Sequence, residues 1–461
     1  MEEIRSRVKN VWMPNSIDRL PDEMLIAIVS RLPMKDAVRT SILAHKWRYF
    51  WVFSSVLHFD GFHIFWNSKY SNASLDSQRI TFGNLVDSVL QLHTGSTIEG
   101  FRIRYQLDST NSNDIDRWVK FAFTKRVTKL ELHLLPFLEY VSDMAYVFPN
   151  ICDPIERLRI FPTGLSSCES LVALRLSCVN VTGEVLEFFI SNCPLLEELC
   201  VEDSISTTSL ITSCPSMRLR HLKIHNCPFL SALEISSPNL LSHLEIADCP
   251  LLRSFEICSR NLLTFTFRGR EVSMTLKNVS SLINLWLVAD VPEALAHNLV
   301  QISRCLSRLE NLWVHISTLE VRHPLPKFPN LPRLKKLWLN VKAYGYDSLL
   351  CLAPLIDAAP MLREIALKVT WRSNIGFPKE IKDTTEGQKH EYLEVLEIIC
   401  FTGSVTEVEF AQYVIEHAVS LKKVVIFFNR PLARGEKKAI ARKAVRLLES
   451  KLSEGVELIA R

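Results

Sequence analysis

The chain has 461 residues, of which 48% are hydrophobic and 23% are charged, and its formal net charge is +4. This balance is typical of a folded globular protein and argues against long disordered regions, and the nearly balanced charge does not favour nucleic acid or a membrane surface as a partner. No run reaches the roughly 18–20 apolar residues that span a bilayer, and residues 1–16 lack the apolar core of a signal peptide.

Twelve cysteines are scattered without a C-x-x-C pair or a His/Cys cluster at zinc spacing. We therefore predict reduced thiols, a cytoplasmic or nuclear location, no metal site and no cofactor. Glycine is scarce, and the chain has no phosphate-binding glycine loop, no Gly-x-Ser-x-Gly turn and no His-Glu-x-x-His motif. These absences argue against an enzyme.

In chain order, residues 1–15 are predicted to be a disordered tail, and residues 16–60 a set of three short helices. Pro21 suits the first turn of a helix and Pro33 ends it. Leu25 and Ile28 belong to an apolar face at helical spacing. A unit below roughly 40 residues rarely folds alone. It therefore either docks on the rest of the chain or is completed by another protein.

Residues 18–51 resemble the plant form of the F-box, with the run Asp18-Arg19-Leu20-Pro21-Asp22-Glu23 and the run Lys35-Asp36-Ala37-Val38-Arg39-Thr40-Ser41. The resemblance implies binding to a Skp-type adaptor and, through it, to a cullin in a cullin-RING ubiquitin ligase. The alternative is a helical cap packed on its own chain. The residues that fit the adaptor-facing pattern of the family are Leu20, Pro21, Leu25, Ile28, Leu32, Pro33, Val38, Leu43 and Trp47.

A connecting segment follows at 61–99, with a polar loop at 66–78 and a helix at 79–92, and a further helix is predicted at 115–123. A short Leu-x-Leu alternation then recurs, which is typical of a strand with one buried face. It occurs at Phe101/Ile103, Leu130/Leu132, Leu158/Ile160, Leu174/Leu176, Leu199/Val201, Leu222/Ile224, Leu244/Ile246, Phe265/Phe267, Leu285/Leu287, Leu312/Val314, Leu337/Leu339, Ile365/Leu367, Leu396/Ile398 and Val424/Ile426.

Repetition at some 20 to 30 residues predicts stacked units, and helix-like stretches at 184–190 and 294–306 separate several of the strands. The pattern resembles an irregular leucine-rich-repeat solenoid over 100–375, with short parallel strands on its concave face. The phrase Asn192-Cys193-Pro194 is similar to a recurring phrase of the plant form. Between 222 and 267 the alternation recurs about every 11 residues, which leaves no room for helices. Here we predict strands on both sides of the solenoid, with about 22 residues in each turn.

After a loop-like stretch at 372–389, the chain alternates between a strand at 390–398, a helix at 405–417, a strand at 421–428 and a helix at 435–452. Residues 388–461 resemble the FBD module found at the end of many plant F-box/leucine-rich-repeat proteins. The module is predicted to cap the open end of the array, as solenoids require. The predicted fold is therefore an α/β repeat: a three-helix F-box, a solenoid and a C-terminal α/β cap.

In each Leu-x-Leu strand the middle residue points away from the core. Three consecutive repeats carry tryptophan there, Trp286, Trp313 and Trp338, with His315 at a neighbouring outward position. Stacked repeats would align the tryptophans in a row, and Trp is the commonest hot-spot residue of interfaces. The row is a candidate target-binding surface. The alternative is that the tryptophans pack on one another or under the C-terminal module, and His315 alone is a surface residue.

From these features we predict the substrate-recognition subunit of an SCF-type ubiquitin ligase. The F-box would bind the adaptor, and the repeats would bind an unidentified target protein. Two alternatives remain open: a non-degradative interaction scaffold, and a receptor in which a small molecule completes the target site. Adaptor binding distinguishes the first alternative from the ligase prediction, and ligand-dependent target binding distinguishes the second.

Overall fold

A computed structural model of the chain contains two compact units, Met1–Cys178 and Val179–Arg461. The structure describes residues 16–32, 34–43, 45–65, 74–135, 144–162, 164, 166, 168–212, 218–236, 240–319, 327–343, 348–371, 387–428 and 436–461. The predicted tail 1–15 and Pro33 lie outside these residues, as do most of the predicted loops 66–78 and 372–389.

The first unit, unit 1, opens with the predicted short helices, the last of which is a 3-10 helix. Its elements are η1 (Ser16–Arg19), α1 (Asp22–Val29), α2 (Met34–Arg39), η2 (Thr40–Ile42), η3 (His45–Phe53), β1 (Val56–Asp60), α3 (Gly61–Phe65), α4 (Leu75–Leu92), β2 (Gly100–Tyr105), η4 (Ser109–Asn111), α5 (Ser112–Thr124), β3 (Lys129–Leu134), β4 (Tyr146–Val147), α6 (Pro154–Ile160) and β5 (Ala173–Ser177). Strands β1, β2, β3 and β5 form a parallel sheet in that order.

The N-terminal helices are attached to this sheet through their last turn. Thr94 N donates to Val52 O at 3.1 Å, and Glu99 N donates to Ser55 O at 2.7 Å. The ring of His93 bonds Ser54 O at 3.0 Å through Nε2. Strand β1 follows directly and pairs with β2. One side of the three-helix segment therefore docks on its own chain.

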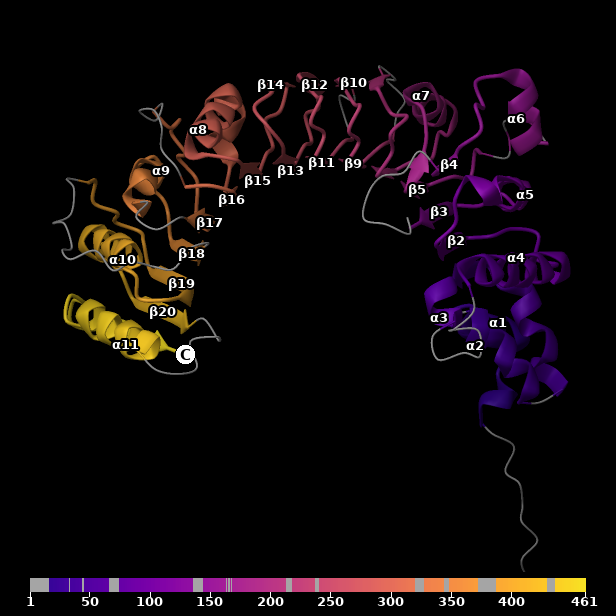
Figure 1. The fold of residues 1–461 in the computed structure, drawn as a ribbon, viewed down its shortest axis with the longest axis horizontal. Helices are drawn as coiled ribbons and strands as arrows, with labels where there is room; N and C mark the ends of the chain where they lie inside the picture. Colours follow the sequence, from indigo (N-terminus) through magenta and orange to yellow (C-terminus); the bar gives the residue numbers. More distant parts are fainter. Residues whose placement is uncertain are drawn as a thin grey trace, which may run out of the picture. The chain divides into compact units, whose positions relative to one another are not determined.

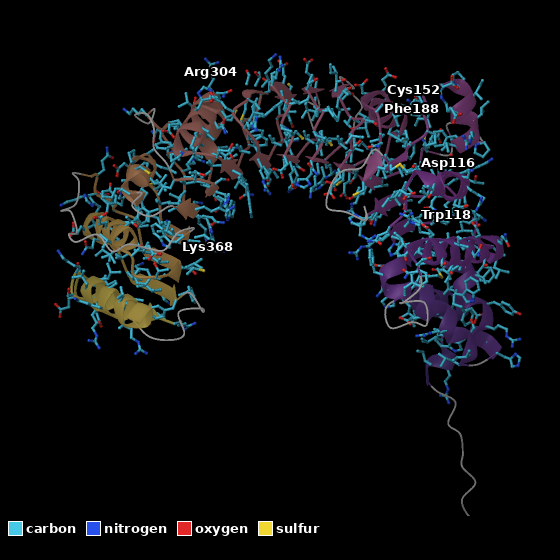
Figure 2. All side chains as sticks on the ribbon, in the orientation of Figure 1. Asp116, Trp118, Cys152, Phe188, Arg304 and Lys368 are labelled. Carbon is cyan, nitrogen blue, oxygen red and sulfur yellow. The ribbon has the colours of Figure 1, made fainter. Side chains whose placement is uncertain are left out.

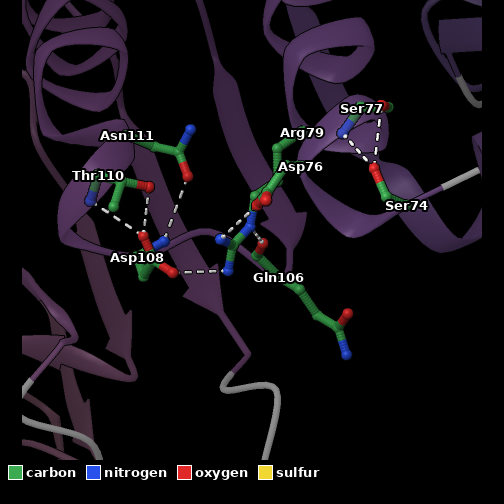
Figure 3. A network of polar contacts seen from close by, with 8 residues as sticks. All are labelled: Ser74, Asp76, Ser77, Arg79, Gln106, Asp108, Thr110 and Asn111. Carbon is green, nitrogen blue, oxygen red and sulfur yellow. Dashed lines mark hydrogen bonds and ion pairs between the residues drawn. The ribbon is translucent and has the colours of Figure 1, made fainter.

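Helix α4 is fixed to the end of β2 by a polar network at its first turns (Figure 3). Ser74 caps the helix by accepting from Ser77 N at 3.3 Å. Arg79 donates from Nε to Gln106 O at 2.7 Å, and its Nη2 lies 2.7 Å from Asp108 Oδ2. Because Arg79 is largely buried and bonded to two groups beyond β2, the helix has one position on the sheet.

The second unit, unit 2, is a repeat array. Its elements are β6 (Val179–Asn180), α7 (Gly183–Asn192), β7 (Glu198–Glu202), β8 (Ser209–Thr212), β9 (His221–His225), β10 (Ala232–Ser236), β11 (His243–Ala247), β12 (Ser254–Cys258), β13 (Thr264–Arg268), β14 (Ser273–Lys277), β15 (Asn284–Ala289), α8 (Pro292–Gln301), η6 (Ser303–Arg308), β16 (Asn311–Ile316), β17 (Lys336–Ala343), η7 (Leu349–Leu352), α9 (Ala353–Asp357), β18 (Glu364–Trp371), β19 (Val395–Phe401), α10 (Val405–His417), β20 (Lys423–Phe428), α11 (Glu436–Glu449) and β21 (Glu457–Ala460).

The main sheet of unit 2 is parallel and runs in the order β7-β9-β11-β13-β15-β16-β17-β18-β19-β20-β21. A second parallel sheet, β14-β12-β10-β8, lies opposite its first strands. Farther along the array, helices α8, α9, α10 and α11 take the place of the second sheet (Figure 1). The other face of the main sheet stays open, and we call it the open face. The two sheets confirm the strands that the 11-residue period predicted on both sides of the array.

The strands of the predicted cap continue the same sheet. β18 pairs with β19, β19 with β20, and β20 with β21. The predicted helix 405–417 is confirmed with those bounds, and the one at 435–452 is confirmed as Glu436–Glu449. Strand β21 was not predicted. Its short Glu-Leu-Ile-Ala sequence contains one alternation step, too little to distinguish a strand from a loop.

Two strand predictions were wrong. Residues 158–160 lie in helix α6, because Asp153 accepts from Ile155 N and Glu156 N and Pro154 occupies the first helical position. The strand predicted at 390–398 begins only at Val395. His390 instead forms an isolated bridge to Ala418, and its ring reaches Asp357 Oδ1 at 3.3 Å.

Acidification is expected to destabilise unit 1 through His93. Burial, supported by the nearby charge of Lys125, lowers the pKa of His93, although its bond to Ser54 opposes the shift. The unfolded chain then binds a proton near pH 6.5 that the folded chain does not bind, so the free energy of unfolding falls as pH falls through about 6.5. The melting temperature should therefore be lower at about pH 5.5 than at about pH 7.5.

The variant His93→Gln removes this titration while keeping a donor for Ser54, and its melting temperature should depend less on pH than that of the wild type. His63 is exposed, and His63→Gln is the matched control on the same unit. An unchanged pH dependence in His93→Gln would show that His93 does not contribute to it.

Candidate protein-binding surfaces

Apolar side chains are exposed on the outer side of the N-terminal helices, and we call this surface the F-box face. Ile42 and Leu43 are 85% and 68% exposed. Ile42 is the last residue of η2 and Leu43 follows it, whereas Thr40 of the same helix is buried. The exposed members are Met24, Ile28, Leu32, Val38, Ile42 and Leu43. Exposed apolar side chains concentrated in one short segment of a folded protein make that segment a candidate interaction site.

The structure separates the nine residues predicted to face an adaptor. Leu25 and Trp47 are buried inside unit 1, and Trp47 packs edge-on against Phe50 with ring centroids 6.0 Å apart. Pro33 lies outside the described residues, and Leu20 is half-buried. The exposed members of the set are Pro21, Ile28, Leu32, Val38 and Leu43. Leu25 and Trp47 therefore hold the helices together, and the exposed group forms the surface available to a partner.

A groove of about 560 Å³ borders the F-box face. Val38 belongs to both, so the exposed surface continues from α2 toward helix α4. The groove is mainly apolar, and its apolar lining residues are Met34, Val38, Trp51, Ile64, Leu85, Val89 and Leu92. The sequence did not predict the groove, because it depends on how α4 packs against the N-terminal helices.

The predicted tryptophan row exists on the open face of unit 2. Trp286 pairs in register with Trp313, and Trp313 pairs with Trp338. The rings of Trp286 and Trp313 stack with centroids 4.6 Å apart and an interplanar angle of 21°. Even so, Trp286 is 45% exposed and Trp338 is 40% exposed. The stacked pair confirms that two of the tryptophans pack on one another, and the row still presents exposed aromatic surface. Target binding by the row stays a prediction.

His315 lies two residues beyond Trp313 on the same face, and cations surround it. Burial is the largest cause that lowers its pKa, and the charges of Lys342, Arg268 and Lys368 lower it further. The three cations were not predicted as part of the surface. Two of them could have been found from the strand alternation, because residues an even number of positions apart lie on one face of a strand. Lys342 lies four residues after Trp338 on β17, and Lys368 lies two residues after Ala366 on β18. We call Trp286, Trp313, Trp338, His315, Lys342 and Lys368 the tryptophan face.

Within the described residues, no group of three or more His, Cys, Asp or Glu side chains is placed to hold a metal ion. The described helices include none that combines the length and apolar character needed to cross a membrane. The principal chemistry of the two surfaces described above is that of aromatic and aliphatic side chains, which are common in protein interfaces.

Comparison with known families gives two matches. The F-box domain family matches residues 17–58, and the family described as the LRR domain of At1g61320/AtMIF1 matches residues 89–243 and 240–457. The second match extends through β19 and β20, which agrees with the continuous sheet of unit 2.

Similar proteins are known from Arabidopsis thaliana. F-box/FBD/LRR-repeat protein At4g00160 is 30% identical over 225 residues, or 46% of this chain and about half (47%) of that protein. F-box/FBD/LRR-repeat protein At5g22700 is 24% identical, with 89% of this chain and 91% of that protein aligned. F-box/LRR-repeat protein 13 is 23% identical, with 89% of each chain aligned. Because the two family matches cover most of the sequence, this chain belongs to the F-box/leucine-rich-repeat family.

Proposed function

We propose that this protein is the substrate-recognition subunit of an SCF-type cullin-RING ubiquitin ligase. In this proposal the F-box face binds a Skp-type adaptor, which connects the protein to a cullin, and the repeats of unit 2 bind the target protein. The chain itself is non-catalytic. Its contribution to ubiquitin transfer is to hold a target close to the transfer machinery, which raises the effective concentration of the reacting groups.

The observation that carries the proposal is the exposed F-box face. Its apolar side chains stand on helices that are anchored to the sheet of unit 1 through Val52, Ser54 and Ser55. An anchored apolar surface binds a partner without a large cost in conformational entropy, because the side chains that make contact are already ordered. The F-box family match over residues 17–58 supports a Skp-type adaptor as that partner.

The test is co-purification of the full chain with a Skp-type adaptor. The variant Leu32→Glu/Leu43→Glu places two charges in the F-box face at exposed positions, where they should not disturb the fold. Each buried apolar anchor of an interface contributes about 2 kcal/mol or more, so we expect the dissociation constant to rise by more than about 100-fold.

The matched control is Ile155→Glu/Leu158→Glu on α6, which places the same charges at exposed apolar positions elsewhere in unit 1. It should bind the adaptor like the wild type, and circular dichroism should show that both variants are folded. Equal adaptor binding by the two variants, or no binding by the wild type, would contradict the proposal.

A further inference from the structure

We propose that the tryptophan face binds an extended acidic segment of a partner protein, in which an apolar residue and an Asp or Glu are separated by one residue. This inference rests on the proposed function, because it specifies the chemistry of the target that the repeats of unit 2 would bind. The groups that bind the lysines would be carboxylate side chains of a polypeptide.

The aromatic part of the surface is a shelf across three strands. Trp286 and Trp313 stack, whereas no aromatic ring among the described residues is paired with Trp338. The exposed indole surfaces of Trp286 and Trp338 lie on either side of Trp313 in the register. Adjacent strands are about 4.8 Å apart, so the shelf is about 10 Å wide, which suits one large apolar side chain and its neighbours.

The electrostatic part of the surface is an excess of positive charge. Lys342 and Lys368 form no ion pair with any carboxylate in the described ranges. They differ in this from most other cations of the open face, which pair with carboxylates on neighbouring strands. These pairs are Lys223–Glu202, Arg268–Asp248, Lys336–Glu364 and Lys423–Glu457. An anionic partner would neutralise the two lysines in the same way.

His315 lies one row beyond the shelf, in the same row as Lys368, and Lys342 lies one row farther. The pairing of β16 with β17 and of β17 with β18 places His315, Asn340 and Lys368 in one row across the face. The imidazole and the amide of Asn340 offer hydrogen bonds to a carboxylate that is held by the lysines. The row therefore combines the cation Lys368 with two neutral polar groups, and Lys342 adds a second cation one row farther along β17.

The distance between the two rows sets the spacing of the ligand. The row of His315 lies two residues farther along the strands than the tryptophan row, which corresponds to about 6.6 Å. In an extended peptide, side chains at i and i+2 lie on one side and are separated by about the same distance. A segment running along the strands would thus place an apolar side chain on the shelf and an acidic side chain, two residues away, beside His315 and Lys368. Lys342 would lie one step farther along the same segment.

The observations favour carboxylates over phosphates. Phosphopeptide recognition typically uses arginine clusters, because the guanidinium binds phosphate through two parallel hydrogen bonds. Arg268, whose charge acts on His315, is already held by Asp248 through Nε at 3.1 Å. Two lysines suit a carboxylate and are too few for nucleic acid, which requires many phosphate contacts.

The test selects random peptides displayed on phage with the full chain and sequences those that are enriched. We expect enrichment of Asp or Glu two positions from an aromatic or large aliphatic residue. The variant Lys342→Glu/Lys368→Glu should lose the acidic preference, and Trp338→Ala should lose the apolar preference. Arg304→Glu/Arg308→Glu is the matched control, since it changes the charge equally on the helical side of unit 2 and not on the sheet side where Lys368 lies (Figure 2).

One selected peptide is then titrated by fluorescence anisotropy. The lysine variant and a peptide with Gln in place of the acidic residue should each bind at least about tenfold more weakly, and the arginine control should bind like the wild type. Absence of the predicted enrichment, equal binding of the Gln peptide, or an equal loss in the arginine control would overturn the proposal. Binding that is at least about tenfold tighter when phosphoserine replaces the acidic residue would also overturn it, in favour of a phosphorylated partner.

Adaptor co-purification with the same variants distinguishes this inference from the proposed function. Lys342, Lys368 and Trp338 lie in unit 2, so their variants should bind the adaptor like the wild type. If the adaptor binds and the peptide selection fails, only the acidic-segment proposal is wrong. If peptides are selected and the adaptor does not bind, the ligase proposal is wrong and the tryptophan face belongs to a non-degradative binding protein.

Discussion

Replacing Phe255 with alanine is expected to lower the free energy of unfolding of unit 2 by about 3–5 kcal/mol. Phe255 lies on β12 of the second sheet and is 2% exposed. Its ring centroid is 6.0 Å from that of Phe265 and 5.8 Å from that of Phe267, both on β13 of the main sheet. The three rings fill the space between the two sheets. In this part of the array the strands follow one another about every 11 residues, so no helix contributes to the core.

The effect should be measurable by urea unfolding followed through tryptophan fluorescence. Trp286 lies on β15, the neighbour of β13, so it reports on the repeats next to the cavity. In a repeat array each unit is stabilised mainly by its neighbours, and a local loss therefore spreads to adjacent repeats. Phe255→Leu is the matched control and should cost less than about 1.5 kcal/mol, because it keeps most of the volume. Equal stability of the alanine and leucine variants would show that the rings do not form this core.

Replacing Glu407 with alanine is expected to lower the free energy of unfolding of unit 2 by about 4 kcal/mol. The carboxylate of Glu407 is fully buried. Its Oε2 accepts from Thr402 N at 3.0 Å, from Thr402 Oγ1 at 2.8 Å and from Ser404 N at 3.1 Å, and its Oε1 accepts from Trp371 Nε1 at 3.4 Å. Alanine would leave four donors without an acceptor, and each buried unsatisfied polar group costs about 1–3 kcal/mol.

Glu407→Gln is the informative comparison. Its amide oxygen can replace Oε2, while its NH₂ group cannot accept from Trp371. Burial raises the pKa of Glu407, against the opposing hydrogen bonds from Thr402, Ser404 and Trp371, so the charged carboxylate carries a desolvation cost that glutamine avoids. We expect Glu407→Gln to lower the free energy of unfolding by about 1–2 kcal/mol, measured by urea unfolding. Similar stability of the alanine variant and the wild type would rule out an anchoring role for this carboxylate.

The structural role of Glu407 is to hold the turn that leads into α10. Ser404 and Glu407 form a reciprocal capping box, and Gly403 between Thr402 and Ser404 has a φ of +77°. A Cβ at Gly403 would lie 2.7 Å from Ala441 Cα on α11. The turn is therefore both left-handed and in close contact with the last helix. Local sequence signals indicated the helix, whereas the bond from Trp371 on β18 to the carboxylate depends on the tertiary structure.

Local sequence largely decided the positions of the repeat strands. Every Leu-x-Leu prediction except Leu158/Ile160 corresponds to an observed strand, because alternation and turn residues act over a few neighbouring positions. The exception arises where Asp153 and Pro154 start a helix, a local signal that outweighs a single alternation step. The two-sided section between 222 and 267 also followed from spacing alone, since an 11-residue interval cannot contain a helix and its two connections.

The division of the F-box residues into core and surface was decided by tertiary structure. Leu25 and Leu43 have similar chemistry and both fit the family pattern, yet Leu25 is fully buried and Leu43 is 68% exposed. Which side of a short helix is covered depends on how α1, α2 and η3 pack on one another and on β1 and α4 beside α2. The residue pattern along each helix does not specify this packing.

The sequence by itself determined the positions of most strands and the alignment of Trp286, Trp313 and Trp338, because these depend on local periodicity and on a constant repeat. The family followed from the resemblance of its motifs to those of known proteins. Only the tertiary structure decided that Lys342 and Lys368 remain without a carboxylate partner among the described residues, whereas Lys336 pairs with Glu364 at 2.7 Å. The physical reason is the register between strands that are about 25 residues apart, since a pair forms only where the register places opposite charges side by side.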